Sequence, residues 1–329
     1  MHSVHAPGDG DALRVTGISK RYAHHVAVSN LSLRVPRGSV FGLLGPNGAG
    51  KTSTIRMLLN IMAPDEGTIE VLGLPSGDPS LVDRLGYLPE ERGLYRKMRV
   101  RDVLRFLGRL KSMPKSGLDA KIDAWLERFQ LRGRGGEDWG KARVEELSRG
   151  MQQKVQFIGA LLHDPELVVL DEPFSGLDPV NAQALKDTVA ELRARGKTVI
   201  FSTHVMENAE RMCDAVCIIS RGEKVLDGPV REVRAQHGAR IAVVVFESPP
   251  SEASRNVFDD PSLVARVNYG HELVEAELTT TADPQQLLVR LIDSGARLQR
   301  FEMVRPSLHR IFLEKVGAEG VEIGLSGHG

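Results

Sequence analysis

The sequence predicts an α/β fold for most of the chain and a small α+β domain near its C-terminal end. Two short apolar runs, 167–170 and 198–202, are separated by a stretch of helical character at 181–195. A strand, a helix and a strand in this order indicate parallel strands joined by a crossover helix, in a sheet with both faces covered. After about residue 240 the strand and helix patterns start again, which indicates the second domain.

The remaining elements follow from apolar periodicity and from breaker residues. Strands are expected at 13–18, 27–35, 40–44, 241–246, 273–278 and 298–304. One helix is expected to have an apolar face formed by Ile55, Leu58, Leu59 and Met62. Pro64 and Gly67 are expected to end that helix, and residues 98–164 are expected to be mainly helical. Asp283 and Ser307 are typical N-cap residues, so a helix is expected after each.

Composition excludes several classes of protein. The chain has 329 residues, and 43 Lys and Arg balance 43 Asp and Glu, which argues against a general nucleic-acid binder. The longest apolar runs, such as 241–246, are too short to cross a bilayer. Residues 1–11 are polar and lack the apolar core of a signal peptide. We therefore expect a cytoplasmic protein without a nucleic-acid partner, with disordered tails at 1–11 and 317–329.

The strongest local signal is the segment 45–52, which matches the phosphate-binding pattern G-x-x-x-x-G-K-[ST] and is called here the phosphate loop. Its glycines allow backbone N–H groups to face phosphate oxygens, and the following helix adds its N-terminal dipole. Lys51 is expected at the β- and γ-phosphates of a nucleotide, and Thr52 is expected to bind Mg²⁺. The residues expected around the phosphates are Gly45, Pro46, Asn47, Gly48, Ala49, Gly50, Lys51, Thr52 and Ser53.

A second signal is the acidic pair Asp171 and Glu172, which ends the apolar strand 167–170. An acidic pair at the end of a strand is weak evidence alone, because many such pairs are only solvated. After a phosphate loop, however, the Asp at this place typically holds Mg²⁺. Glu172 is then expected to orient the attacking water and take its proton, as a general base.

The order of these motifs resembles the ATP-binding subunit of an ABC transporter. The segment Leu-Ser-Arg-Gly-Met at 147–151, called here the signature segment, precedes the acidic pair by one helix. Ser-Gly-Leu-Asp at 175–178 follows the pair, and His204 ends the next strand. The resemblance covers about residues 13–228. It implies a P-loop NTPase core, so we expect an ABC ATP-binding domain at 12–238, with a helical subdomain at about 95–164, and a small α+β domain at 239–316.

The resemblance implies a role for each matching residue. Tyr22 would stack on adenine, and His204 would hold the γ-phosphate and the attacking water. The segment at the start of the 151–162 helix would contact the γ-phosphate bound by the opposite subunit, which suits an anion site at a helix N-terminus. Asp178 would communicate between subunits. The residues expected at the dimer contact are Ser148, Arg149, Gly150, Met151 and Asp178.

The chain departs from the usual family pattern at two places. The signature segment is usually Leu-Ser-Gly-Gly-Gln, so Arg149 adds a charge and Met151 removes an amide. Glu90 stands where a Gln normally touches Mg²⁺ and the water, which makes it a third expected metal residue beside Thr52 and Asp171. Both departures are similar to those of the sodium-extrusion (NatA-like) subgroup, whose members also carry a small C-terminal α+β domain.

The resemblance implies an ATP-hydrolysing motor subunit with ATP and Mg²⁺ as its cofactors. It would dimerise around MgATP, as a homodimer or heterodimer, and drive a separate integral-membrane permease that holds it at the inner face of the cell membrane. The helices at 100–129 would touch the permease. The subgroup implies export, of Na⁺ or of a drug.

Two alternatives remain open at this point. The first is a soluble ABC-type ATPase that acts on ribosomes or DNA without a permease. Such proteins usually carry two ATPase cassettes or long coiled-coil insertions, whereas this sequence has one phosphate loop and no heptad run. The second concerns the C-terminal domain, which is either a structural or dimerisation cap or a regulatory ion-binding module. No spacing fixes a metal site among the acidic and histidine residues of this domain, His271, Glu272, Glu275 and Glu277.

Overall fold

The computed structural model describes residues 10–23, 25–91, 93–132, 138–236, 240–270 and 273–317. The described chain forms two compact units, which meet in the sequence between Val230 and Arg231. Most of the two predicted tails lies outside the described residues, but Asp11, which was assigned to the first tail, begins a strand. No helix in the described part of the chain has both the length and the apolar character needed to cross a membrane.

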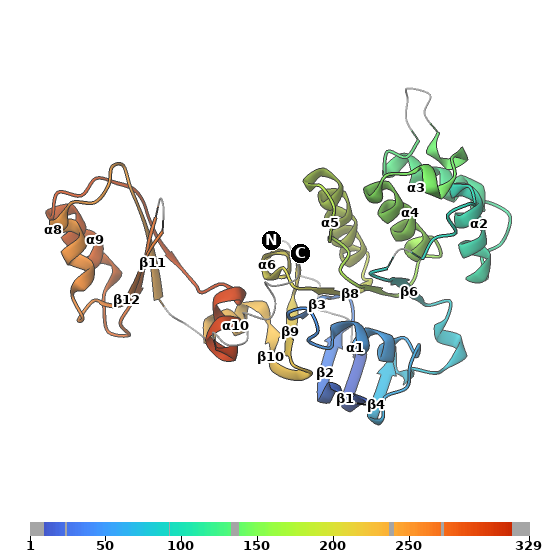
Figure 1. Ribbon diagram of the computed structural model, residues 1–329, viewed down its shortest axis with the longest axis horizontal. Helices are drawn as coiled ribbons and strands as arrows, with labels where there is room; N and C mark the ends of the chain where they lie inside the picture. The colour runs from blue at the N-terminus through green and yellow to red at the C-terminus, as the bar shows by residue number, and fades with distance from the viewer. Residues whose placement is uncertain are drawn as a thin grey trace. The chain divides into compact units, whose positions relative to one another are not determined.

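The centre of the first unit is a six-stranded sheet in the order β10-β9-β3-β8-β7-β6 (Figure 1). The strands are β3 (Val40–Leu44), β6 (Leu85–Leu88), β7 (Leu167–Leu170), β8 (Thr198–Thr203), β9 (Ala215–Ser220) and β10 (Glu223–Pro229). All neighbouring pairs are parallel except β9 and β10 at one edge. The parallel pairing of β7 with β8 confirms the α/β fold predicted from the sequence.

The central strands are apolar at nearly every position because both faces of the sheet are covered. In β7, Leu167 and Val169 face a core that is shared with a second sheet. Val168 and Leu170, which point to the opposite face, are equally buried. Helices α5 (Pro179–Ala194) and α6 (Met206–Met212) contact strands of this sheet.

The second sheet of the first unit is antiparallel, in the order β2-β1-β4-β5. Its strands are β1 (Asp11–Tyr22), β2 (His25–Pro36), β4 (Glu66–Val71) and β5 (Leu74–Pro75). Helix α1 (Lys51–Leu58) joins both sheets through one core, to which it contributes Ile55, Met57 and Leu58. The sequence did not predict β4, because only two of its six residues are buried.

Helix α1 ends at Leu58, which corrects the end predicted at Pro64 and Gly67. Asn60 adopts a left-handed backbone with φ of 54°, and the N–H of Ile61 bonds back to the carbonyl of Arg56 at 2.9 Å. Asparagine tolerates this conformation better than most residues, so it ends the helix one turn earlier than the next breaker.

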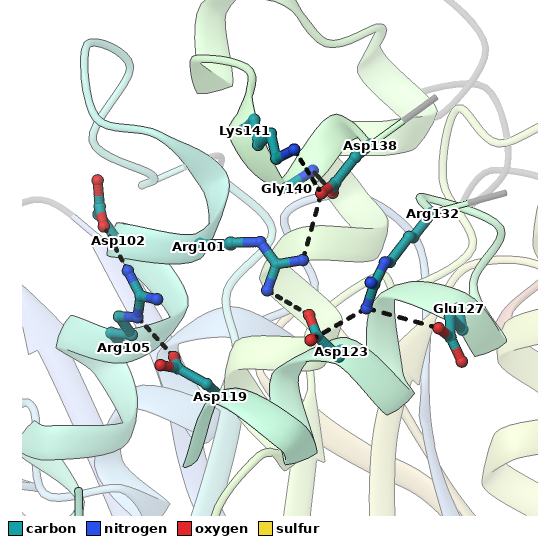
Figure 2. A network of polar contacts seen from close by, with 10 residues as sticks. All are labelled: Arg101, Asp102, Arg105, Asp119, Asp123, Glu127, Arg132, Asp138, Gly140 and Lys141. Atoms are coloured by element: carbon teal, nitrogen blue, oxygen red, sulfur yellow. Dashed lines mark hydrogen bonds and ion pairs between the residues drawn. The ribbon is translucent and has the colours of Figure 1, made fainter. Parts of the chain in front are cut away.

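Three helices, α2 (Val100–Leu110), α3 (Leu118–Arg128) and α4 (Arg149–Leu161), lie together beside β6 (Figure 1). The stretch 139–146 between α3 and α4 contains only two short 3₁₀ turns, so the predicted helical region is interrupted there. Figure 2 shows the ion pairs that tie α2, α3 and the turn after them, centred on Arg101. Arg101 contacts Asp123 on α3 and Asp138 before the first turn.

The second unit contains one antiparallel sheet in the order β12-β13-β11-β14. Its elements are β11 (Arg240–Phe246), α8 (Glu252–Asn256), β12 (Val264–Tyr269), β13 (Val274–Leu278), α9 (Pro284–Asp293), β14 (Leu298–Val304) and α10 (Leu308–Val316), preceded by α7 (Val230–Gln236). Phe258, Leu287 and Leu291 form its core with the sheet. The side chains of Asp283 and Ser307 cap α9 and α10, which confirms the two predicted helix starts.

Candidate functional site

The site forms at the edge where parallel strands of the central sheet end. The register aligns Leu43 of β3 with Ser202 of β8, and Leu170 of β7 with Leu88 of β6. The carboxyl ends of such strands meet at one edge, where α/β proteins bind their ligands. The topology therefore brings together the phosphate loop, the Glu90 loop, the acidic pair and His204, although these segments lie far apart in the sequence.

The phosphate loop is confined by backbone on two sides, so Gly45 and Gly50 cannot be replaced without displacement of that backbone. A Cβ at Gly45 would lie 2.2 Å from the carbonyl oxygen of Ile219, and a Cβ at Gly50 would lie 2.3 Å from that of Ala27. Gly50 also has a φ of 101°, which side-chain-bearing residues rarely adopt. It is the N-cap of α1, so the loop leads directly into a helix N-terminus, where anions bind.

Lys51 is the first residue of α1, and its side chain is buried in the loop. Its Nζ donates hydrogen bonds to the carbonyl oxygens of Gly45 at 2.8 Å and Pro46 at 3.2 Å. The same Nζ lies 3.3 Å from Oε1 of Glu172. The ammonium group is thus positioned between the phosphate loop and the acidic pair, where it can pair with a phosphate group.

The acidic pair is held by Ser202, a residue for which the sequence analysis predicted no role. The Ser202 hydroxyl donates to Oδ1 of Asp171 at 2.5 Å and accepts the backbone N–H of Glu172 at 2.9 Å. Burial raises the pKa of Asp171, and the nearby charge of Glu172 adds to this effect, while the hydroxyls of Ser202 and Thr52 oppose it. The only sequence signal for Ser202 was its position directly after the apolar run 199–201 and two residues before His204.

The other carboxylate oxygen of Asp171 fits a metal ion. Its Oδ2 is buried and has no hydrogen-bond partner among the described residues, and a buried oxygen of this kind is costly unless something binds it. Mg²⁺ prefers oxygen ligands and is usually held by one or two carboxylates together with substrate phosphates. Among the described residues, no group of three or more acidic, His or Cys side chains is placed to hold a metal ion by itself.

Glu172 and His204 form a pair at the opening of the site. His204 Nδ1 lies 3.1 Å from Oε1 of Glu172, and the His204 side chain is 47% exposed, whereas Glu172 is buried. Glu172 has a φ of 46°, a strained conformation for a residue other than glycine. One carboxylate oxygen of Glu172 therefore contacts both a buried ammonium and a half-exposed imidazole, and these two contacts hold the side chain at the opening of the site.

A cavity of about 340 Å³, called here the phosphate-loop cavity, is lined by Glu172 but not by His204. Its lining residues are Tyr22, His25, Ala27, Asn47, Gly48, Ala49, Gly50, Lys51, Thr52, Ser53, Glu90 and Glu172. No sequence motif pointed to His25 and Ala27, which lie on β2. Gly45 and Pro46 do not line the cavity, but they hold Lys51 through their carbonyls.

Glu90 lines the phosphate-loop cavity together with Lys51 and Glu172. Burial raises its pKa, and the charges of Asp171 and Glu172 raise it further, whereas Lys51 lowers it. Arg92, two positions after Glu90 in the sequence, lies outside the described residues. The carboxyl group of Glu90 therefore belongs to the same electrostatic environment as the acidic pair.

The signature segment and Asp178 do not line the phosphate-loop cavity. Ser148 is the N-cap of α4 and accepts the N–H of Met151 at 3.3 Å, and Asp178 is the N-cap of α5 and accepts the N–H of Asn181 at 3.0 Å. Hydrogen bonds from Asn181 lower the pKa of Asp178. A Cβ at Gly150 would lie 3.1 Å from Nδ2 of Asn181, so the two helix starts are neighbours.

The N-terminus of α4 is exposed at Ser148 and Arg149. Its buried face carries two amides that the sequence analysis also missed. Gln156 Nε2 donates to the carbonyl of Glu91 at 3.0 Å, in the loop that follows β6. Gln153 Nε2 lies 3.4 Å from the carbonyl of Pro173, directly after the acidic pair. Polar residues three positions apart within the apolar stripe of a helix were the available signal. Helix α4 is therefore linked to the segments that follow β6 and β7, which carry Glu90 and Asp171.

Two protein families match the chain. The family described as "ABC transporter" matches residues 28–175, and the family described as "ATP-binding protein DrrA1-3-like, C-terminal domain" matches residues 228–316. The uncharacterized ABC transporter ATP-binding protein YhaQ of Bacillus subtilis is 40% identical over 306 residues, which are 93% of this chain and 99% of that protein. Nod factor export ATP-binding protein I of a Rhizobium species is 37% identical over 310 residues, which are 94% and 98% of the two chains.

Solved structures are similar to about two thirds of this chain. One described as the structure of the ATP-binding subunit of an ABC transporter has a TM-score of 0.62 and 30% identity, and the match covers 68% of this chain and 92% of that one. CbiO1 of Clostridium perfringens, described as part of the transporter complex cbiONQ, has a TM-score of 0.59 and 25% identity, with 69% and 91% covered.

Proposed function

The chain belongs to the family of ABC transporter ATP-binding subunits, and from this premise we propose that it hydrolyses MgATP to drive an exporter whose permease is a separate membrane protein. ATP binding is common to the family. The observation that carries the proposal is the convergence of Lys51, Glu172 and Glu90 on one cavity, with Asp171 buried behind it. This arrangement combines an anion site, a base and oxygen ligands for a cation.

In the proposed mechanism the phosphate loop and Lys51 bind the β- and γ-phosphates, and Tyr22 stacks on adenine. Thr52, Asp171 and Glu90 would hold Mg²⁺, which supplies charge neutralisation at the phosphates when it is bound. Glu172 takes a proton from the attacking water while the water oxygen bonds to the γ-phosphorus and the bond to the leaving ADP oxygen breaks. His204 orients the Glu172 carboxylate and binds the γ-phosphate.

We propose that the ATPase works as a dimer, because the signature segment lies away from its own cavity. The exposed start of α4 offers backbone N–H groups and the Ser148 hydroxyl, and Arg149 adds a positive charge to this anion site. A second copy, or a related subunit, would use this surface to complete the phosphate-loop cavity from the other side. Asp178 on the neighbouring helix start would then face the partner subunit.

The direction of transport is proposed to be export. Relatives named for Nod factor export support this direction. Glu90 and the altered signature segment support membership of the sodium-extrusion (NatA-like) subgroup. Na⁺ and a larger organic solute such as a drug are therefore the two substrates to test, in vesicles that contain the chain and its permease.

The test of hydrolysis is the variant Glu172→Gln, which keeps the size of the side chain but removes the base. We expect the rate of ATP hydrolysis to fall by at least about 100-fold, while MgATP still binds and an ATP-bridged dimer accumulates in gel filtration. Glu223→Gln, the same change at an exposed position of β10, should behave as the wild type. Lys51→Ala should lose nucleotide binding itself. Wild-type turnover by Glu172→Gln would exclude this residue as the base.

The permease is tested by purification of the tagged chain from detergent extracts of its own host. We expect an integral-membrane protein to be recovered with it. Recovery with ribosomes or DNA, and without a membrane protein, would instead support the alternative of a soluble ABC-type ATPase. Either result is independent of the hydrolysis assay.

A further inference from the structure

The second unit contains a cavity of about 860 Å³, called here the C-terminal cavity. It is formed by the end of β11, the segment that leads into α8 and the ends of β12 and β13. Its apolar lining residues are Val245, Phe246, Pro249, Pro250, Tyr269, Leu273 and Val274. The volume lies within the usual range of small-molecule sites, which are mostly apolar with a few placed polar groups. None of its lining residues belongs to the phosphate-loop cavity.

One wall of the C-terminal cavity is aromatic and held in place by the core. Phe246 and Tyr269 line the cavity, and both pack edge-to-face on Phe258, with ring centroids 6.4 and 6.2 Å away. Phe258 is 2% exposed and belongs to the core of the unit, whereas Tyr269 is 49% exposed. The two lining rings are therefore held in place by Phe258 and also line the cavity, so they are available to contact a ligand.

The charged groups of the same cavity are mainly negative. Three carboxylates, Glu247, Glu252 and Asp259, line it with one guanidinium, Arg255. None of these four side chains forms an ion pair with another described residue. The charge of Asp259 also acts on the aromatic wall, because it adds to the effect of burial in raising the pKa of Tyr269. An apolar cavity with an excess of unpaired carboxylates is complementary to a positive charge.

We propose that the C-terminal cavity binds an organic cation with an apolar body. The cationic group would lie over the faces of Tyr269 and Phe246, near Asp259, since aromatic faces and carboxylates both attract it. The apolar body would fill the rest of the cavity against Leu273 and Val274. A metal ion bound directly by the protein requires several converging oxygen ligands, and no group of three or more acidic, His or Cys side chains among the described residues is placed to supply them.

Tetraphenylphosphonium is a suitable probe, because it carries a permanent positive charge within four phenyl groups. Tetraphenylborate has the same groups and size but the opposite charge. We expect the purified full-length chain to bind one phosphonium ion in equilibrium dialysis at physiological salt, at least about 10-fold more tightly than the borate. Equal affinity for the two ions, tighter binding of the borate or no binding of the phosphonium would overturn the proposal.

Substitutions in the C-terminal cavity test whether the phosphonium ion binds there. Asp259→Asn and Tyr269→Ala should each weaken phosphonium binding by about 3- to 10-fold, and Tyr269→Phe should retain it, because the ring remains. Asp293→Asn is the matched control, since Asp293 is an exposed carboxylate of the same unit outside the cavity. If Tyr269→Ala does not fold, Asp259→Asn and Tyr269→Phe still test whether the phosphonium ion binds in the C-terminal cavity. Unchanged affinity in Asp259→Asn would place the probe elsewhere and contradict the proposal.

Discussion

At the scale of single residues, the site depends on a few buried groups that hold the charged ones. Ser202 is fully buried, and its one hydroxyl contacts both members of the acidic pair. It fixes an oxygen of Asp171 and the backbone of Glu172, and Glu172 in turn contacts Lys51 and His204. Ser202 is therefore a positioning residue, because it acts on the reaction through its neighbours.

We predict that Ser202→Ala lowers kcat by about 10-fold and changes the KM for ATP little. Loss of the hydroxyl leaves two buried polar groups without a partner, at about 1–3 kcal/mol each, and this loosens the acidic pair more than the phosphate loop. Ser202→Thr retains a hydroxyl and should recover most of the rate. Steady-state ATPase assays at saturating Mg²⁺ provide the comparison. An equal rise in KM would indicate a general loss of the fold at this strand.

At Glu90, we predict that the Mg²⁺ dependence of ATP hydrolysis changes with pH. Because the pKa of Glu90 is raised, this side chain stays neutral to a higher pH than an ordinary glutamate and then ionises. Above that pKa it adds a carboxylate that Mg²⁺ can neutralise, so the half-saturating Mg²⁺ concentration of the wild type should fall as pH rises. Glu90→Gln cannot ionise, and its Mg²⁺ curve should change less with pH.

The measurement for Glu90 is a Mg²⁺ titration of ATPase activity at several pH values for both proteins. At the lowest pH the two sets of curves should be close, because neutral Glu90 resembles Gln. Superimposable curves at every pH would mean that Glu90 does not share the metal site.

At the scale of elements, the helices beside β6 are fixed by ion pairs as well as by apolar packing. Arg101 on α2 reaches Asp123 on α3 and Asp138 in the following turn, and its side chain is 16% exposed (Figure 2). Arg105, one turn later on α2, pairs with Asp102 and Asp119, but these groups are much more exposed. Comparison of the two arginines therefore measures how much burial of an ion pair contributes to the free energy of unfolding.

We predict that Arg101→Met lowers the free energy of unfolding by about 2 kcal/mol, and Arg105→Met by less than about 1 kcal/mol. Asp123 keeps its contact with Arg132 at 3.0 Å in the first variant, so the loss stays below that of a fully orphaned buried charge. Urea unfolding followed by tryptophan fluorescence reports on these helices, because both tryptophans of the chain lie there, on α3 and in the turn at 139–141. Equal losses would show that burial of the Arg101 network contributes nothing.

At the scale of the whole molecule, the phosphate-loop cavity and the C-terminal cavity belong to different compact units. We propose that residues 12–238 and 239–316 are separate domains. Every residue that lines the phosphate-loop cavity comes before residue 173.

A chain shortened to residues 1–238 should therefore bind MgATP with an affinity within about 3-fold of that of the full chain, since no contact to the nucleotide is removed. It should lose phosphonium binding, and regulation or subunit association should weaken. Nucleotide binding by calorimetry tests the first expectation. A folded short chain that no longer binds ATP would assign part of the site to the second unit.

The sequence by itself determined the fold class, the order of the motifs and the family. These depend on local patterns: apolar runs mark the strands, and segment 45–52 is contiguous and directly precedes a helix. Helix starts at Asp283 and Ser307 could be predicted for the same reason, because a cap acts on the N–H groups two or three residues away. The early end of α1, at Leu58 before the left-handed Asn60, was not predicted, because asparagine is a weaker signal for a helix end than proline.

Only the tertiary structure decided which distant side chains meet. Ser202 contacts Asp171 because β8 lies beside β7 in the sheet order, and Glu90 shares their environment because β6 is on the other side of β7. Packing also decides that the signature segment does not line the cavity of its own chain. The same holds for the C-terminal cavity, whose lining residues lie between Val245 and Gln299 in the sequence. The strand–helix–strand pattern indicates that β7 and β8 are parallel, but it does not give the full order of the strands or their register. These contacts therefore became visible only when the sheets were assembled.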